Sequence, residues 1–205
     1  MHKFLFFSLL VIIFSTSPYY AYSQDEMSVK ELEGLAKNGD AEAQYKMGTR
    51  YISGNGVKKD VKRAIELFNQ SAAQDYTRSL YILGKLYWDG TYIKKKDSKA
   101  IEWFEKAARK GHGNAQYNLA VILSRYPNNK EFLIKSYAWF SVVSKRGHPK
   151  AGKMRDELAE KLEAFDVVQG KRMAGSYYSK YVVAFDESLR EDEDEGDENE
   201  EQSEE

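Results

Sequence analysis

Residues 41–72 read AEAQYKMGTRYISGNGVKKDVKRAIELFNQSA, and the order of apolar residues in this stretch decides the fold. In the first half, Ala43, Met47 and Tyr51 stand four positions apart, which places apolar side chains on one face of a helix. The second half has the same helical spacing at Ala64, Ile65, Phe68 and Ala72. The stretch therefore predicts two amphipathic helices that pack against each other.

A glycine-containing turn separates the two predicted helices. Residues 53–57 read SGNGV, and glycine permits the positive φ angle of a helix end and a tight turn. Asp60 follows as the predicted N-cap of the second helix. Gly48 lies inside the first helix, where glycine costs about 1 kcal/mol relative to alanine, so we expect a close approach of the paired helix there.

This αα-hairpin pattern recurs with a step of 36 residues. Tyr45, Tyr81 and Tyr117 mark the successive first helices. Other positions that keep the step are Ala43/Ser79/Ala115, Met47/Leu83/Leu119, Gly48/Gly84/Ala120, Ala64/Ala100/Ser136, Phe68/Phe104/Phe140 and Ala72/Ala108/Ser144. A register held over so many positions predicts three stacked helix-turn-helix units.

The repeated residues resemble the Sel-one-like repeat family, whose members are relatives of tetratricopeptide repeats, and residues 41–72 are the best copy. The resemblance covers about 41–148 and is preceded by a lone helix near 29–36. Residues 136–159 also resemble the closing segment of bacterial members. The third unit departs from the pattern because RYPNN at 125–129 replaces the glycine turn, so we expect its loop geometry to differ.

The second unit also departs from the first. It has Tyr92 where the first unit has Gly56, and its predicted acidic N-cap moves to Asp97. More generally, the acidic residues near turns are predicted as helix caps: Asp60, Asp75, Asp89 and Asp97.

The predicted fold is all-α: an α/α solenoid of about three 36-residue helix-turn-helix repeats with capping helices at both ends. The predicted segments are a signal peptide (1–23), an N-terminal capping helix (24–40), the three repeats (41–148), C-terminal capping helices (149–185) and a disordered acidic tail (186–205). The last capping helix carries Phe165, Val168, Met173, Tyr177 and Tyr181, and we expect it to cover the open end of the stack.

The N-terminal residues predict export. Lys3 supplies a positive charge, residues 4–14 are apolar apart from Ser8, and Ala-Tyr-Ser at 21–23 places small residues before a cleavage site at Gln24. The alternative is a retained anchor, but the apolar run is shorter than the roughly 20 residues that span a bilayer. We therefore expect a mature protein that is periplasmic or secreted and has no transmembrane segment.

Composition narrows the chemistry. The absence of cysteine excludes a disulfide scaffold, a thiol nucleophile and a cysteine-ligated metal. Residues 24–185 hold 29 basic and 19 acidic side chains, a net charge of +10, whereas residues 186–205 hold 13 acidic and 1 basic, a net charge of −12. Dense like charge with few apolar residues predicts the disorder of the tail.

No known catalytic or nucleotide-binding motif occurs in the sequence. His112 and His148 follow a glycine at the same repeat phase, which places them on successive units about 10 Å apart, too far for one metal site. We interpret both as solvent-facing turn residues. The sequence thus predicts no catalytic residue, no cofactor and no metal.

The candidate binding residues lie on the first helices. In tetratricopeptide-like hairpins these helices line the inner, concave surface, and the resemblance implies the same placement here. The candidates are Tyr45, Thr49, Tyr81, Lys85, Trp88, Tyr117 and Val121. Tyrosine and tryptophan offer large, rigid contact surfaces, and the positions of Thr49, Lys85 and Val121 differ between units as a partner-facing surface would. The alternative is that the tyrosines only fill space between adjacent helices.

Two basic clusters lie near the turns of the first two units. They consist of Lys58, Lys59, Lys62 and Arg63, and of Lys94, Lys95, Lys96 and Lys99. Three interpretations stay open: a solvated face, a site for an anionic polymer or lipid, and contact with the acidic tail. A nucleic-acid partner is not expected, because the chain is predicted to be exported and has no nucleic-acid module.

These patterns favour a non-catalytic exported interaction module that binds a peptide or protein segment on its concave face. The resemblance implies a second hypothesis, a secreted factor in host or cell–cell interaction. A third hypothesis, an enzyme acting on a cell-wall fragment or β-lactam, comes from cysteine-rich relatives and loses support because this chain has no cysteine.

Overall fold

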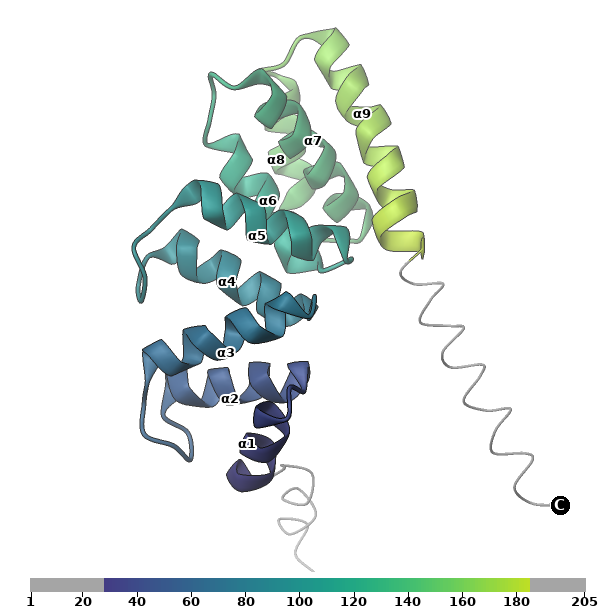
Figure 1. Cartoon of the computed structure of the whole chain (residues 1–205). Coiled ribbons are helices and arrows are strands. Elements are labelled where there is room, and N and C mark those ends of the chain that lie inside the picture. The colour runs from purple at the N-terminus through teal and green to yellow at the C-terminus, as the bar shows by residue number, and fades with distance from the viewer. Residues whose placement is uncertain (1–27, 185–205) are drawn as a thin grey trace, which may run out of the picture.

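The computed structural model describes residues 28–184, and this part of the chain is helical without strands (Figure 1). Its elements are α1 (Val29–Lys37), α2 (Ala41–Ser53), α3 (Val61–Ala73), α4 (Thr77–Asp89), α5 (Asp97–Arg109), α6 (Gly113–Ser124), α7 (Lys130–Lys145), α8 (Ala151–Ala159), α9 (Ala164–Tyr178) and the π-helical segment η1 (Ser179–Val183). The predicted signal peptide and acidic tail lie outside the described residues.

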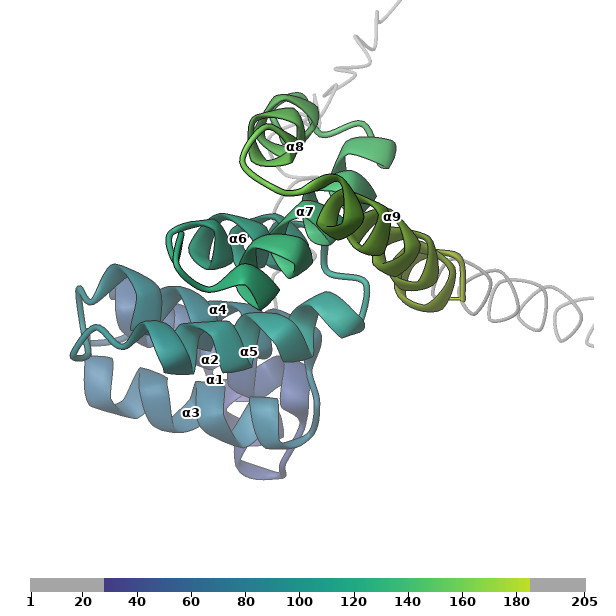
Figure 2. The ribbon, with the colours of Figure 1, turned by 90° about the horizontal axis from the view of Figure 1, so that it is seen from above.

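The helices pair and stack as the repeat predicts. α2 packs on α3, α4 on α5 and α6 on α7, while α3 packs on α4 and α5 on α6, so that each hairpin rests on the one before. Figure 1 shows the stack from α1 at one end to α7–α9 at the other, and Figure 2 views it from above. α4 also contacts α6, and no comparably close contact joins α5 to α7 within residues 28–184. The first helices α4 and α6 therefore lie closer to each other than the second helices α5 and α7 do.

The turns of the first two hairpins have the same construction. Gly54 and Gly90 end α2 and α4 with φ angles of 81° and 73°, a conformation that glycine adopts without a side-chain penalty. Beyond each turn the chain returns to the helix it left: the N–H of Asp60 donates to the carbonyl of Tyr51 (3.0 Å), and the N–H of Lys96 donates to that of Tyr87 (2.9 Å). The equivalence of these bonds explains why the two loops keep one length.

The third turn has a different geometry, as its sequence predicts. α6 ends at Arg125 in a right-handed conformation rather than at a left-handed glycine. The turn is instead fixed against the second unit, because the Tyr126 hydroxyl lies 3.0 Å from Asp97 Oδ2 and the Arg125 guanidinium lies 5.2 Å from the Trp88 ring centroid.

A phenylalanine from each second helix forms the centre of the core. Phe68, Phe104 and Phe140 are all buried. Glycine in the facing first helix makes room for two of these rings, since a Cβ atom on Gly48 would lie 2.7 Å from Phe68 Cε1 and one on Gly84 would lie 2.5 Å from Phe104 Cδ1. The expected close approach of paired helices at Gly48 is thus present.

The predicted acidic caps are correct at one position of four. Asp60 caps α3, accepting the N–H of Arg63 at 2.9 Å. Asp75 instead takes a left-handed conformation (φ 63°) before α4, and Asp89 is the last residue of α4. Asp97 lies just inside α5, after the N-cap residue Lys96, and accepts the Tyr126 hydroxyl. The cap prediction failed at Asp97 because α5 begins at this residue, so that Lys96 and not Asp97 stands at the N-cap position.

The C-terminal helices cover more than the open end of the stack. α8 and α9 both pack on α7, and η1 reaches back to contact α5. Tyr177 and Tyr181 stack on the buried Trp139 with ring centroids 4.4 and 5.9 Å away. Lys130 joins α7 to α9 through the buried Asp166, with Nζ and Oδ2 3.0 Å apart. The segment therefore closes the outer side of the last hairpin as well as its end.

None of the helices within residues 28–184 has the length and apolar character needed to cross a bilayer.

Candidate binding surface

Three aromatic pairs run along the first helices, one at each junction between units. Tyr45 lies 5.6 Å from Tyr76, Tyr81 stacks on His112 at 4.4 Å, and Tyr117 stacks on His148 at 4.1 Å between ring centroids. The second ring of each pair comes from a residue before the next helix of the stack: Tyr76 precedes α4, His112 precedes α6, and His148 lies in the turn before α8. We call this set the aromatic row: Tyr45, Tyr76, Tyr81, His112, Tyr117 and His148.

Each of the three first-helix tyrosines, Tyr45, Tyr81 and Tyr117, joins the surface to the core. Tyr81 lies 6.0 Å from the buried Phe104, and the equivalent pairs Tyr45–Phe68 and Tyr117–Phe140 are separated by 6.1 and 5.9 Å. All three tyrosines are half-buried. The structure thus supports a packing role for them, and it also leaves part of each ring open to solvent.

The two histidines are not the solvent-facing turn residues that the sequence suggested. Both are half-buried against a tyrosine ring. His112 is also the N-cap of α6, and its Nδ1 accepts the backbone N–H of Ala115 at 3.2 Å. The interpretation failed because a residue after a turn glycine can still lie beneath the neighbouring unit. Tyr76 was missed altogether, although it precedes the two histidines by one and two repeat steps.

Burial lowers the pKa of His112, and the positive charges of Arg78 and Arg146 add to this effect. The neutral imidazole is therefore the form that the fold holds. Since Nδ1 is a hydrogen-bond acceptor here, protonation at that atom would remove the cap of α6.

The first prediction follows from this lowered pKa. The unfolded chain binds a proton near its ordinary histidine pKa of 6.5, before the folded chain does, so the free energy of unfolding should fall as the pH drops through about 6.5. Urea unfolding at about pH 7.5 and about pH 5 measures this loss. His112→Asn keeps a capping acceptor without a titrating ring and should lose less stability over that interval. An equal loss in both proteins would contradict the assignment to His112.

The positions that flank the row differ from unit to unit. Thr49 is exposed, Lys85 pairs with Asp89 (Nζ–Oδ2 3.7 Å), and Val121 is half-buried. Trp88 is less available than the sequence suggested, because its ring meets Phe104 edge-on at 5.8 Å and carries Arg125 over one face at 5.2 Å.

Two shallow hollows open beside the row. One, of about 400 Å³, is lined by Glu42, Gln74, Asp75, Tyr76, Thr77 and Arg78. The other, of about 220 Å³, is lined by Gly113, Asn114, Val143, Arg146, Gly147 and His148. Each contains one ring of the aromatic row together with polar and backbone groups. Such a combination suits a peptide segment, whose side chains need apolar contact while its backbone needs hydrogen-bond partners.

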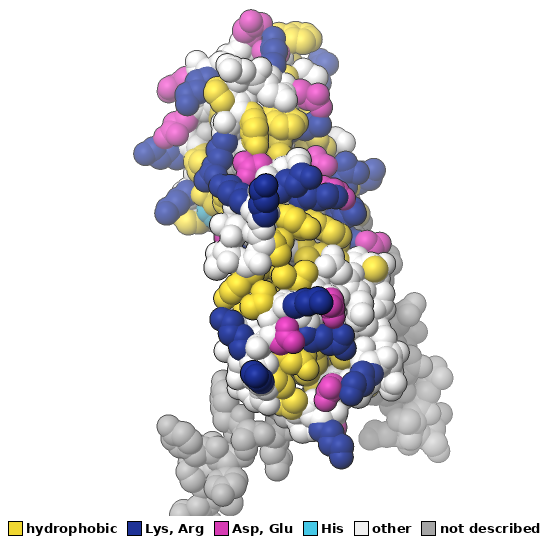
Figure 3. Space-filling model, turned by 60° about the vertical axis from the view of Figure 1, so that its left-hand side comes forward, with side chains coloured by type: hydrophobic (Ala, Val, Ile, Leu, Met, Phe, Trp, Pro, Cys, Tyr) yellow, Lys and Arg dark blue, Asp and Glu magenta, His cyan; other side chains and the backbone are white. Residues whose placement is uncertain are grey.

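The two basic clusters lie on neighbouring loops. Lys59 Nζ lies 5.4 Å from the centroid of the Tyr92 ring, which joins the first loop to the second. Most of the cluster side chains are exposed, and Figure 3 shows Lys and Arg side chains along this side of the molecule. Two members also pair within their own helix, Arg63 with Glu66 at 3.2 Å and Lys99 with Glu102 at 2.8 Å. Binding of an anionic polymer or lipid by these two basic clusters stays a prediction.

No group of three or more histidine, aspartate or glutamate side chains within residues 28–184 is arranged to hold a metal ion. The aromatic row likewise lacks a nucleophile paired with a base. What the arrangement offers is contact surface.

The fold and this surface define an α/α solenoid of stacked helical hairpins. Comparison with known families makes the assignment more specific: the model of the Sel1 repeat matches residues 41–76 and 77–112. These residues are therefore two Sel1 repeats, as the resemblance predicted. The third hairpin, α6–α7, lies outside the matched residues.

Two solved structures have a similar architecture of stacked helical hairpins. A Sel1 repeat protein from Oxalobacter formigenes has a TM-score of 0.53 and 26% identity, covering 62% of this chain and 96% of that protein. The protective antigen c5321 of uropathogenic Escherichia coli, which has an SLR fold, has a TM-score of 0.53 and 22% identity. That match covers 83% of this chain but only 45% of c5321. Among curated proteins, no sequence matches this chain. The two Sel1 repeats indicate a repeat scaffold for interactions between proteins.

Proposed function

We propose that this protein is an exported, non-catalytic module that binds a peptide or protein segment along the aromatic row. The observation that carries the proposal is the contrast between constant and variable positions. The rings of Tyr45, Tyr81 and Tyr117 keep the same partners in the core, whereas the flanking residues change in charge and size from unit to unit. We expect this contrast when packing against the core determines the constant residues and contact with a partner determines the flanking residues.

The contact between the first helices α4 and α6, together with the two hollows beside the aromatic row, supports this choice of surface. A segment lying across α2, α4 and α6 would meet an aromatic ring at each unit and a polar hollow beside the rings of Tyr76 and His148. Aromatic side chains lose little conformational entropy on binding, which makes them effective contact residues.

Site-specific photo-crosslinking in producing cells tests the proposal. A benzophenone side chain at the exposed positions of Thr49 or Arg78, on the first helices, should give the same crosslinked partner. Matched controls at Asn69 on α3 and Gln169 on α9 are also exposed but lie on other elements, and should not give it. Capture of one partner from all four positions, or from none, would contradict binding along the row.

Export is the second part of the proposal and has its own test. We expect residues 1–23 to be removed, because a short apolar run precedes the Ala-Tyr-Ser cleavage site. Intact-mass measurement on protein from the cell envelope and the medium should give a chain that begins at Gln24. A mass that includes Met1 would indicate a retained anchor. The fraction in which the protein is found also distinguishes a periplasmic module from the alternative, a secreted factor in host or cell–cell interaction.

A further inference from the structure

One position of the second helix differs between units in a way that the aromatic row does not explain. Leu67 in α3, Trp103 in α5 and Trp139 in α7 stand one repeat step apart. Trp103 is half-buried with Lys106 Nζ 4.5 Å from its ring centroid, and Trp139 is buried beneath the tyrosines of the C-terminal segment. Both later units therefore fill this place with a large ring.

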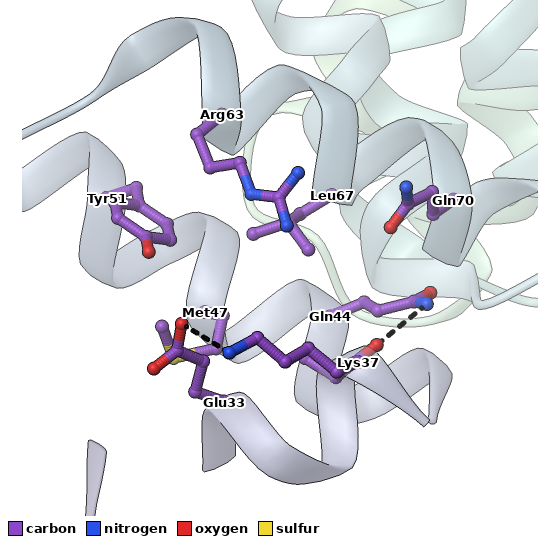
Figure 4. A pocket seen from close by; sticks show the side chains of 9 residues that line it. Glu33, Lys37, Gln44, Met47, Tyr51, Arg63, Leu67 and Gln70 are labelled. Atoms are coloured by element: carbon purple, nitrogen blue, oxygen red, sulfur yellow. Dashed lines mark hydrogen bonds and ion pairs between the residues drawn. The ribbon is translucent and has the colours of Figure 1, made fainter. Parts of the chain in front are cut away.

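The first unit leaves a hollow there instead. It measures about 340 Å³ and lies between α1, α2 and α3. Its buried apolar lining residues are Ala36, Met47 and Leu67, which we call its floor. Figure 4 shows Met47 and Leu67 among the side chains around the hollow. The remaining lining residues are Glu33, Lys37, Gln44, Tyr51, Arg63 and Gln70.

One change in the sequence accounts for this difference. Leucine replaces the tryptophan that occupies the equivalent position in the next two units, and the smaller side chain leaves space between α1, α2 and α3.

The rim of the hollow carries two cationic side chains, Arg63 and Lys37, and one carboxylate, Glu33. Arg63 lies across the opening from Lys37 in Figure 4. Arg63 Nη1 is 3.2 Å from Glu66, but a guanidinium carries five N–H donors and can serve a second carboxylate. Lys37 Nζ is 3.1 Å from Glu33; an exposed pair of this kind contributes little stability, so the ammonium group can also pair with an incoming carboxylate.

We propose that this hollow binds an aromatic side chain that stands next to a carboxylate in a partner protein. The aromatic group is inferred from the later units. The equivalent position holds Trp103 in the second unit, and in the third it holds Trp139, on which Tyr177 and Tyr181 stack. The carboxylate is argued from Arg63 and Lys37 at the rim. The site lies against α1 and α3, so it is separate from the aromatic row and does not depend on the proposed function of that row.

Methyl NMR on the chain from Gln24 to Glu205 tests this proposal, because Met47 in the floor reports on the hollow. N-acetyltryptophan serves as the probe. N-acetyltryptophan amide lacks the carboxylate, and N-acetylaspartate lacks the ring. The Met47 methyl signal should shift saturably with N-acetyltryptophan, with a Kd on the order of 1 mM. N-acetyltryptophan amide should bind more weakly, and N-acetylaspartate should cause no shift.

Two substitutions separate the ring from the charge. Leu67→Trp should fill the hollow as its equivalents do and abolish the shift, whereas Leu67→Met keeps the volume and should retain it. Arg63→Gln should weaken N-acetyltryptophan binding by about fivefold or more. Its matched control is Lys62→Gln, which removes a neighbouring exposed charge that does not line the hollow. Arg63→Gln alters only an exposed side chain, so it remains informative if Leu67→Trp fails to fold.

The proposal is overturned if N-acetyltryptophan leaves the Met47 signal unchanged at about 10 mM. It is equally overturned if Leu67→Trp folds and binds as before, or if Arg63→Gln and Lys62→Gln behave alike. A Met47 shift on deletion of residues 186–205, without any probe, would identify the chain's own tail as the occupant and would also overturn the partner assignment.

Discussion

Phe104→Ala is expected to lower the free energy of unfolding by about 3–5 kcal/mol, the range for removing a large ring from a packed core. Phe104 is fully buried, and three surrounding groups are fitted to its ring. Tyr81 lies 6.0 Å away, Trp88 meets it edge-on at 5.8 Å, and Gly84 leaves the space that the ring occupies. Because these contacts come from the central hairpin, the loss should affect the whole stack.

Urea unfolding followed by circular dichroism measures this change, with the slope of the transition as a check that unfolding stays cooperative. The matched control is Phe165→Ala on α9, where the same side chain is removed from a position that is 76% exposed. We expect the control to change stability by no more than about 0.5 kcal/mol. Similar losses in the two variants would mean that the core is not organised around Phe104.

The helical hairpins were predictable from the sequence because their signals are local and repeated. The spacing of Ala43, Met47 and Tyr51 defines a helix face without knowledge of any partner, and the 36-residue step gives the same answer at each unit. The third turn, 125–129, shows the limit of this reasoning. The sequence shows that this turn differs from the glycine turns of the first two units. Its contacts with Asp97 and Trp88 are visible only in the folded structure.

The candidate surface was predictable only in part. Tyr45, Tyr81 and Tyr117 share a repeat phase, which identified one side of the aromatic row. The other rings of the row, Tyr76, His112 and His148, also share one repeat phase. They differ in residue type, so the repeat pattern did not identify them as one set. Their contacts cross from one unit to the next, so spacing within a unit does not reveal them.

The hollow of the first unit was also beyond sequence reasoning of this kind. The change from tryptophan to leucine at position 67 is visible once Trp103 and Trp139 are aligned with it. Whether such a change leaves space depends on how the neighbouring helices α1 and α2 pack around the position, and only the structure shows that packing.

Gly84→Ala is expected to destabilise the protein by about 1–3 kcal/mol, although alanine is the better helix former. Two effects oppose each other at this position in α4. The helix propensity of alanine would stabilise the chain by up to about 1 kcal/mol, whereas an added Cβ would lie 2.5 Å from Phe104 Cδ1 and 2.7 Å from Cε1. The ring is fully buried and packs against Tyr81 and Trp88, so overpacking should outweigh propensity.

Gly34→Ala separates these two effects, because Gly34 is also inside a helix, α1, but nothing lies within 4 Å of a Cβ added there. Propensity acts alone at that position, and the variant should be more stable by about 0.5–1 kcal/mol. Urea unfolding of both variants should therefore give changes of opposite sign. If Gly84→Ala were stabilising as well, α4 and α5 would lie farther apart than the structure places them, and the close contact of paired helices could not be what keeps glycine at this position.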